Sequence, residues 1–448
     1  MLKPETARDR AAELVGLAQK AGADAADAAF VASASESIQV RLGKLEDVER
    51  SESEHIGLRV FVGKRNASIG SSDLGADALR ELAGRAVAMA RAAPEDAYAG
   101  LAPKDMLASG PFPELDMSDP GEPGPEHLRA MAEEAEEAAL AVDGITNSEG
   151  AGASAGSSLF ALATSDGFAG AYGATSRSIS ATVVAGEGGA KQRDYAWRQA
   201  RHSEDLLPPA EIGRKAGERT IGKLNPGRLK SGPMPVVFDP RIGGSLIGHL
   251  ISAMTGTAIA RRASFLLGKD GEALFGTGIT IAEDPHRKRG LRSRPFDGEG
   301  LPTSPHKLVN AGCLTGWLMD SASARQLAQL PTGHASRGAG GAPGISVSNV
   351  HLEAGSASPE ELMADIGEGV YVTEMFGHGV NGVTGDFSRG AAGFRIVGGE
   401  IAGPVAEFTV AGNLLGMFAQ LAPANDLEWF RAINVPTIRV DGMTVAGE

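Results

Sequence analysis

The sequence predicts an α+β protein, in which a two-layer α/β N-terminal region is followed by a β-rich C-terminal domain, barrel-like or a sandwich. In the first part of the chain, helical and strand-like segments come as helix, strands, helix, which is typical of a two-layer module rather than an alternating βαβ fold. Glycine is frequent, at 61 residues, whereas aromatic residues make up only 5% of the chain. This composition favours many turns and closely packed strands with small side chains. Hydrophobic residues make up 42%, which is enough to form buried cores.

Residues 1–108 are predicted to form the N-terminal α+β module. Apolar residues recur at helical spacing from Thr6 to Ala21, and Gly22 follows as a natural helix C-cap. Strand-like segments come next, and a second helix closes the module. The predicted strands are 25–31, 36–42, 56–62 and 66–70, and the closing helix is 78–93.

A proline- and glycine-rich stretch at 109–125 predicts an exposed connection. Residues 126–230 then continue the N-terminal half as a helix followed by a β-rich block. The predicted elements are a helix at 126–142, strands between 144 and 201, and a helix at 208–223. We place a domain boundary near 225–235.

The C-terminal domain, 231–448, is predicted to be β-rich with one central helix. It opens with a buried type of strand at 234–238, and the helix follows at about 243–260. The rest is strand-like and rich in glycine. Asn310-Ala311-Gly312 and Gly398-Gly399 predict the turns of two β-hairpins.

Charge and cysteine content exclude several classes of protein. The net charge is −14 and the pI is near 5.2, so the surface repels phosphate backbones and we expect no nucleic-acid partner. Cys313 is the only cysteine, which excludes an internal disulfide and a cysteine-rich metal site. The N-terminal residues are charged and amphipathic, and no apolar run reaches the roughly 18 residues of a membrane span. We expect a cytoplasmic protein without a membrane partner.

Three motif-like stretches carry little weight. A G-x-S-x-G sequence surrounds Ser154, but its context, EGAGASAGSS, reads as a low-complexity loop rather than a nucleophile elbow. A G-x-G-x-x-G sequence at 377–382 follows an apparent strand, yet no helical pattern comes after it to hold a pyrophosphate. The basic cluster from Arg287 to Arg294 contains no aromatic residue for stacking on bases and is predicted to be a solvated loop, with contact to an acidic peptide or partner left open.

The predicted central helix raises the question of a metal site, because GGSLIGHLISAMTG contains His249. A helical zinc site needs two histidines one turn apart and a glutamate as general base. No carboxylate and no second histidine follow His249 within two turns. The pattern therefore favours a core or interface histidine.

The chain resembles the TldD/PmbA family of modulator-of-gyrase peptidases, and specifically its PmbA (TldE) branch. The resemblance rests on long stretches in order, above all VYVTEMFGHGVNGVTGDFSRGAAGFRIVGGEIAGPVAEFTVAGNLLGMF, together with VVFDPRIGGSLIGHLISAMTG, SRPFDGEGLPT and TNSEGAGASAG. It implies an α+β region followed by a β-rich region, assembled as dimers. In the TldD branch the central helix carries HExxxH and a later cysteine adds a ligand. Here the motif is absent, Cys313 lies too early, and the register does not show whether His249 overlays either histidine.

The resemblance implies a subunit of a TldD/TldE-type zinc metalloprotease that acts on unfolded or leader peptides and antitoxins, with this chain as the non-catalytic partner. No catalytic or metal-binding residue can be assigned. Zinc is expected in a TldD-like partner, with a heterodimer as the assembly and a homodimer left open for the chain alone. Strand addition suits such a peptide site, because backbone hydrogen bonds need little side-chain selectivity. The expected peptide or partner surface comprises Thr373, Glu374, Asp386, Phe387 and Ser388.

Two other functions stay open at this point. One is an autonomous peptidase with non-standard ligands such as Glu374 and His378, which stand four residues apart. The other is a binding protein that modulates gyrase without proteolysis.

Overall fold

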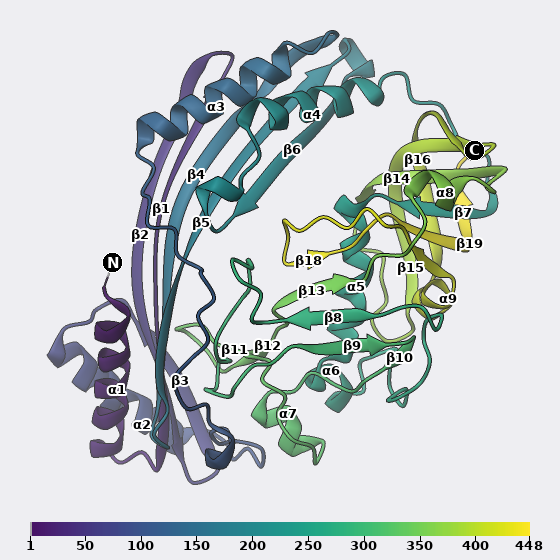
Figure 1. The fold of residues 1–448 in the computed structure, drawn as a ribbon. Helices are drawn as coiled ribbons and strands as arrows, with labels where there is room; N and C mark the ends of the chain where they lie inside the picture. The colour runs from purple at the N-terminus through teal and green to yellow at the C-terminus, as the bar shows by residue number, and fades with distance from the viewer. Residues whose placement is uncertain (1) are drawn as a thin grey trace.

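The computed structural model describes residues 2–448, which form two regions: a long curved sheet with helices, and a β-rich C-terminal region (Figure 1). The N-terminal region contains α1 (Pro4–Lys20), β1 (Ala25–Arg41), β2 (Lys44–Val62), β3 (Arg65–Ser71), α2 (Ala76–Ala92), a 3₁₀ turn (Lys104–Met106), α3 (Pro125–Leu140), β4 (Ile145–Thr164), β5 (Ala169–Ala185), β6 (Gln192–Ala200) and α4 (Pro209–Gly222). Two further 3₁₀ turns, Gly188–Ala190 and Ser203–Asp205, flank β6.

The N-terminal sheet has six strands in the order β3-β2-β1-β4-β5-β6, and all neighbours are antiparallel. Helices α1 and α2 lie at one end of the sheet and α3 and α4 at the other (Figure 1). Phe30 and Ile38 of β1 are both buried against these helices, in the core of the first and the second pair respectively. Ala29 points to the opposite face, as alternation along a strand requires, and contacts the C-terminal region there. The sheet therefore has one helix-covered face and one face toward the rest of the protein.

The C-terminal region is built around a closed five-stranded barrel in the order β16-β15-β14-β7-β19, with β16 pairing back to β19. This agrees with the predicted fold class. The barrel strands are β7 (Gly232–Phe238), β14 (Glu368–Phe376), β15 (Asp386–Val397), β16 (Glu400–Asn413) and β19 (Ile438–Ala446). The other elements are α5 (Pro240–Met254), α6 (Gly256–Ala260), α7 (Ser321–Gln326), α8 (Pro359–Met363), α9 (Leu414–Ala419) and β17 (Leu421–Pro423).

A second sheet lies between the barrel and the N-terminal sheet (Figure 1). Its five strands have the order β10-β9-β8-β13-β18, and a separate two-stranded ribbon pairs β11 with β12. The strands are β8 (Ile281–Asp284), β9 (His306–Asn310), β10 (Cys313–Leu314), β11 (Ala335–Ser336), β12 (Gly344–Ile345), β13 (Asn349–Leu352) and β18 (Ile433–Asn434). Both predicted hairpins are present, at 310–313 and 397–400, with positive φ at both central residues of each turn.

The two regions are joined by an aromatic cluster and a buried ion-pair network. Phe296 of the C-terminal region is fully buried against Phe168 and other aromatic residues of the N-terminal region. Nearby, Asp27 of β1 accepts hydrogen bonds from Arg59 of β2 (2.7 Å) and Arg337 of the C-terminal region (2.7 Å). Asp27 is therefore charge-compensated from both regions, which favours one fixed arrangement of the two.

The predicted helix at about 243–260 is in fact two helices, because the chain is extended at Thr255 between α5 and α6. At this break the Gly256 amide donates to the carbonyl of Leu318 (2.7 Å) instead of continuing the helical ladder. A side chain at Gly256 would collide with Met319 and Ser323, so glycine fits this close approach. A tertiary contact thus overrides the helical pattern.

Two local predictions were wrong in the N-terminal sheet. The predicted strands 25–31 and 36–42 are one strand, β1, and the stretch around Ser154 is not a loop but the middle of β4. Ser154 Oγ lies 2.8 Å from Ser178 Oγ on β5, a cross-strand contact between small polar side chains. β4 is a strand because it pairs with β1 on one side and β5 on the other. Its small residues have little strand preference of their own, so the local sequence did not predict it.

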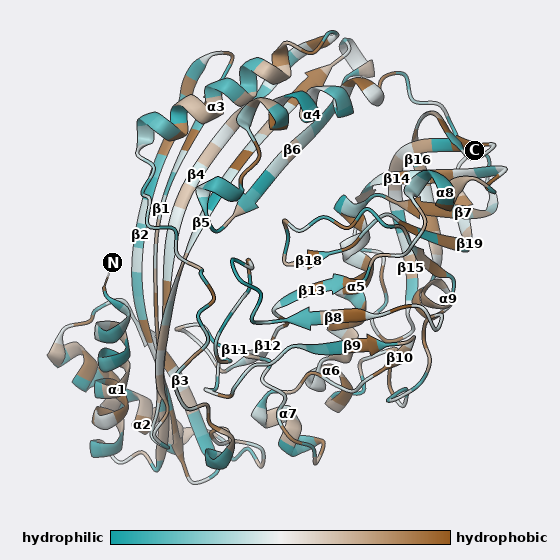
Figure 2. Ribbon diagram, viewed as in Figure 1, coloured by the Kyte–Doolittle hydropathy of each residue, from teal (hydrophilic) through white to brown (hydrophobic). Residues whose placement is uncertain are grey.

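No helix formed by residues 2–448 is both long and apolar enough to cross a membrane. Figure 2 shows β6 as largely hydrophilic, which fits its position at the edge of the N-terminal sheet.

Candidate functional site

Helix α5 occupies the middle of the chain and begins directly after the buried strand β7. Asp239 caps its N-terminus by accepting a hydrogen bond from the Arg241 amide (2.8 Å), and Pro240 fits the first turn. Leu246, Leu250 and Met254 recur on one face and are buried in the main C-terminal core. The helix is thereby held firmly against the barrel.

His249 projects from α5 beside this core. Its ring lies 6.3 Å from the ring of Phe387, in an edge-to-face arrangement, and its Nε2 atom is buried with no hydrogen-bond partner among the described residues. Burial, and secondarily the positive charge of Arg389, lower the pKa of His249. The imidazole is therefore neutral at physiological pH.

A cavity of about 270 Å³, which we call the α5 cavity, opens beside His249. It is lined by His249, Ser252, Ala253, Ala263, Phe265, His378, Val380, Gly382 and Arg389. A catalytic zinc needs three protein ligands, normally histidine with a carboxylate or thiolate. This lining offers two imidazoles, no carboxylate and no thiolate. It also contains the guanidinium group of Arg389, whose positive charge would repel a bound zinc ion. The donor set at α5 does not fit a zinc ion.

Two of the residues expected on a peptide or partner surface lie inside the C-terminal region. Thr373 on β14 is 4% exposed and Phe387 on β15 is 1% exposed. Phe387 packs in the main core and supports the ring of His249. Neither side chain is available on the surface of this chain.

Glu374 links the two regions. Its carboxylate pairs with Lys223, at the end of α4, and Lys223 Nζ also lies 3.0 Å from the buried Asp194 of β6. Asp194 is paired in turn with Arg241 of α5 (3.1 Å). Glu374 is thus committed to an inter-region network and does not form a metal pair with His378.

Asp386, Ser388 and His378 are exposed near the α5 cavity. Asp386 accepts hydrogen bonds from the Thr384 hydroxyl (2.6 Å) and from Asn413 (3.2 Å). The Ser388 amide donates to the carbonyl of Gly379 (2.6 Å), which holds the loop between β14 and β15 on the barrel. With these contacts the side chains of Asp386 and Ser388 remain exposed on the surface.

Two adjoining cavities, of about 340 and 600 Å³, lie between β6 and the C-terminal region, and we call them together the arginine cleft. They share Gln199, Leu291 and Arg431. The basic side chains that line the cleft are Arg198, Arg201, Arg241, Arg287, Lys288, Arg289, Arg292, Arg389 and Arg431, whereas Asp205 is the one acidic residue among the lining residues. In a chain with a net charge of −14, this is a marked local excess of positive charge.

Two of these guanidinium groups, those of Arg287 and Arg431, lie against aromatic rings and have no carboxylate partner. The guanidinium carbon of Arg287 lies 3.5 Å from the ring centre of Trp429, and that of Arg431 lies 5.0 Å from the Trp197 ring. Within residues 2–448, no carboxylate lies within 4 Å of the charged groups of Arg201, Arg287, Lys288, Arg292, Arg389 or Arg431, so none of the six is in an ion pair. The loop around Arg287, which was predicted to be solvated, lines one side of this basic cleft.

The edge of β6 forms one wall of the arginine cleft. Lys223 Nζ caps the carbonyl of Arg193 (3.1 Å) and Arg219 caps that of Tyr195 (3.2 Å). Alternate residues of an edge strand present their backbone groups to the same side. The backbone groups of Trp197 and Gln199 therefore face the same free edge as those of Arg193 and Tyr195. Both of these residues line the cleft. A strand edge that can accept an extended chain thus meets a basic cavity.

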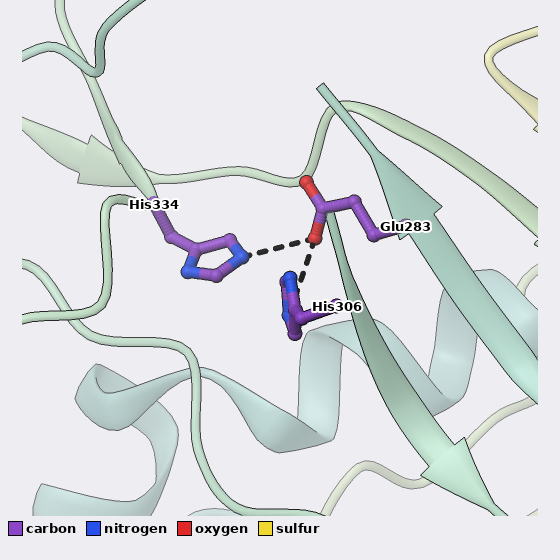
Figure 3. Close-up of side chains that lie close together, drawn as sticks. All are labelled: Glu283, His306 and His334. Atoms are coloured by element: carbon purple, nitrogen blue, oxygen red, sulfur yellow. Dashed lines mark hydrogen bonds and ion pairs between the residues drawn. The ribbon is translucent and has the colours of Figure 1, made fainter. Parts of the chain in front are cut away.

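Sequence reasoning missed one cluster completely. Glu283 of β8, His306 of β9 and His334 before β11 bring one ligand atom each within 4.8 Å of one another, as Figure 3 shows. It is the one group of at least three such side chains found among residues 2–448. The three residues are far apart in the sequence and form no motif, so the cluster becomes visible only in the folded chain.

Three family models match this chain in order and together span most of it. They are the PmbA/TldA metallopeptidase domain 1 (residues 26–90), central domain (118–224) and C-terminal domain (231–447). The two-region fold and these matches together identify the class of the protein, which is that of metallopeptidase-like proteins. The chain belongs to the PmbA/TldD metallopeptidase family, which confirms the resemblance found in the sequence.

Individual relatives support the same assignment over nearly full length. The metalloprotease PmbA of Escherichia coli O157:H7 is 36% identical over 427 residues, which is 95% of this chain and 93% of that protein. A PmbA homologue of Haemophilus influenzae is 34% identical over 97% of this chain and 94% of its own length.

Solved structures share the fold. A candidate modulator of DNA gyrase from Bacteroides thetaiotaomicron has a TM-score of 0.92 at 27% identity, with both chains covered completely. TldE from Thermococcus kodakarensis has a TM-score of 0.87 at 22% identity, covering 98% of this chain and all of that one. The second likeness concerns the fold alone.

Proposed function

We propose that this chain is the non-catalytic, peptide-holding subunit of a TldD/TldE-type zinc metalloprotease that acts on unfolded or leader peptides. The observation that carries the proposal is the α5 cavity. In a metallopeptidase family, its helix offers the single His249, and Arg389 places positive charge where a zinc ion would need donors. The zinc and the general base are therefore assigned to a TldD-like partner chain.

The peptide is proposed to lie in the arginine cleft, paired with the edge of β6. Extended chains bind strand edges mainly through backbone hydrogen bonds, which suits substrates of varied sequence. Trp197 and Gln199 supply the backbone groups at this edge. Arg219 and Lys223 cap the strand just before this point, so the added strand would begin beside Trp197.

The charge of the cleft selects among peptides. Six basic side chains without a carboxylate partner favour segments rich in Asp or Glu, or a terminal carboxylate. Arg287 and Arg431 are the best placed of these, because aromatic rings fix their guanidinium groups while leaving the charge uncompensated. We therefore expect acidic peptides to bind more tightly than neutral ones.

The remaining expected residues keep more modest proposed roles. Asp386 and Ser388, exposed near the α5 cavity, are proposed to face the catalytic partner, and the buried Phe387 and Thr373 are proposed to support them from within the C-terminal region. A heterodimer is the proposed assembly. A cytoplasmic location fits a chain whose single cysteine can form no internal disulfide.

The experiment measures hydrolysis of an unfolded acidic peptide by the purified chain, by a TldD-like chain, and by their mixture, with zinc present throughout. The proposal predicts no hydrolysis by this chain alone and a higher rate for the mixture than for the TldD-like chain. Hydrolysis by this chain alone would support an autonomous peptidase instead. A pull-down of gyrase without any TldD-like chain separates the third function, direct binding to gyrase.

A further inference from the structure

The cluster comprises Glu283 and His306 of the second sheet and His334 before β11, and none of the three lines the α5 cavity or the arginine cleft. Glu283 Oε2 is 2.9 Å from His334 Nε2 and 3.6 Å from His306 Nε2. Figure 3 shows both imidazole rings directed at this one carboxylate oxygen from different segments of the chain. Three separate strands or loops thus converge on a single point.

Glu283 is a buried carboxylate without a permanent cation. It is 2% exposed and His334 is 3% exposed. Within residues 2–448, its ion-pair partners are the two imidazoles alone, with no arginine or lysine. Burial of such a group is costly unless a positive charge and hydrogen bonds compensate it.

The other oxygen of this carboxylate is held by the backbone. Glu283 Oε1 accepts a hydrogen bond from the Ser348 amide, so that oxygen is fixed while Oε2 faces the two imidazoles.

The other nitrogen of each imidazole is oriented by an outer partner. His306 Nδ1 lies 3.4 Å from the carbonyl of Ser304, so it carries the proton and its Nε2 presents a lone pair to Glu283. His334 Nδ1 lies 2.7 Å from the hydroxyl of Thr332. That hydroxyl accepts the Met319 amide (2.8 Å) and can accept Nδ1–H as well, which leaves the Nε2 of His334 free to bind a metal. Such outer hydrogen bonds fix metal-ligating histidines.

We propose that Glu283 Oε2, His306 Nε2 and His334 Nε2 bind a divalent transition-metal ion, with zinc as the best fit. Tetrahedral zinc bonds of about 2.0–2.1 Å place neighbouring ligand atoms about 3.3 Å apart, close to the observed separations of 2.9 and 3.6 Å. Two imidazoles select zinc or a similar ion over magnesium or calcium, which prefer oxygen ligands. His306 is the one ligand of the three that is not buried.

The ion would link β8, β9 and the segment before β11. It would place a positive charge beside the buried carboxylate of Glu283. The site uses none of the residues on which the proposed function rests, so its test is independent of that function.

The test uses the full chain, stripped of metal with a chelator and titrated with Zn²⁺ against a chromophoric competitor. The wild type is expected to bind one equivalent, and His306→Ala should bind at least about 100-fold more weakly. His378→Ala is the matched control, because it removes one imidazole from the α5 cavity and should leave the affinity unchanged. Zinc should also raise the melting temperature of the wild type but not of His306→Ala.

Glu283→Gln separates loss of a ligand from loss of folding. Gln retains the shape and can accept the Ser348 amide while removing the buried charge. This variant should melt no lower than the metal-free wild type and yet lose zinc binding. Absence of a bound equivalent in the wild type, or equal affinity in His306→Ala, would overturn the proposal. Loss of binding in His378→Ala would instead place the ion at α5.

Discussion

Replacement of Phe296 by alanine tests the joint between the two regions most severely. Phe296 is fully buried, and its ring contacts four others, with centroid distances of 4.9 Å to Phe168, 5.1 Å to Phe112, 5.3 Å to Tyr172 and 6.3 Å to Phe160. The ring is contributed by the C-terminal region, whereas the other four belong to the N-terminal region. Its removal therefore leaves a cavity at the interface rather than within one core.

The cost of this change can be worked from the packing. Truncation of a buried Phe to Ala typically costs about 3–5 kcal/mol, a range that already includes lost contacts such as the edge-to-face ones with Phe168 and Tyr172. The strand backbone already touches the ring, because a Cβ on Gly170 would lie 2.7 Å from it, so little inward collapse can relieve the cavity. We expect a loss of about 4 kcal/mol in the free energy of unfolding.

Urea unfolding followed by circular dichroism measures this loss. Phe376→Ala is the matched control, since Phe376 is 55% exposed on β14 and its truncation should cost less than about 1 kcal/mol. If Phe296→Ala costs less than about 1 kcal/mol, the aromatic cluster does not join the two regions as described.

Further predictions concern the arginine cleft and the pH dependence of stability. Arg287→Ala and Arg431→Ala should each weaken binding of an acidic peptide about 10-fold, more at low salt than at high salt, because each removes a charged donor; fluorescence anisotropy measures this, and exposed Arg85→Ala should have no effect. Equal affinity for the acidic peptide and its Gln-substituted form would contradict the proposed role of the cleft. Burial, together with the charge of Glu299, raises the pKa of Asp297 to about 6 from 3.8. The folded state therefore binds this proton more tightly than the unfolded state, so stability should fall by up to about 3 kcal/mol as pH rises from 4 to 6. Urea unfolding midpoints measured between about pH 4 and 6 test the direction of this change. An increase in stability with pH that is attributable to Asp297 would contradict it.

The sequence predicted the parts of the fold that depend on local pattern. Alternation and glycine pairs located the hairpin at Gly398-Gly399, and helical periodicity located α5. It failed where tertiary pairing decides. The break at Thr255 depends on Leu318, and the strand around Ser154 depends on β1 and β5.

The candidate site was even less visible in the sequence. His249 could be placed on the central helix, and the missing ligands around it could be recognised from spacing alone. The arginine cleft could not, because its walls come from β6, the Arg287 loop and the segment around Arg431. Likewise, Glu283 and His334 meet only because β8 and the segment before β11 adjoin in space.

The most direct test of the central claim is the rate of peptide hydrolysis by this chain with and without a TldD-like chain. Both chains are purified, supplied with zinc, and assayed on the same unfolded acidic peptide. The account predicts no hydrolysis by this chain alone, hydrolysis by the mixture, and a lower rate when Arg431→Ala replaces the wild type. Efficient hydrolysis by this chain in the absence of any partner would contradict it.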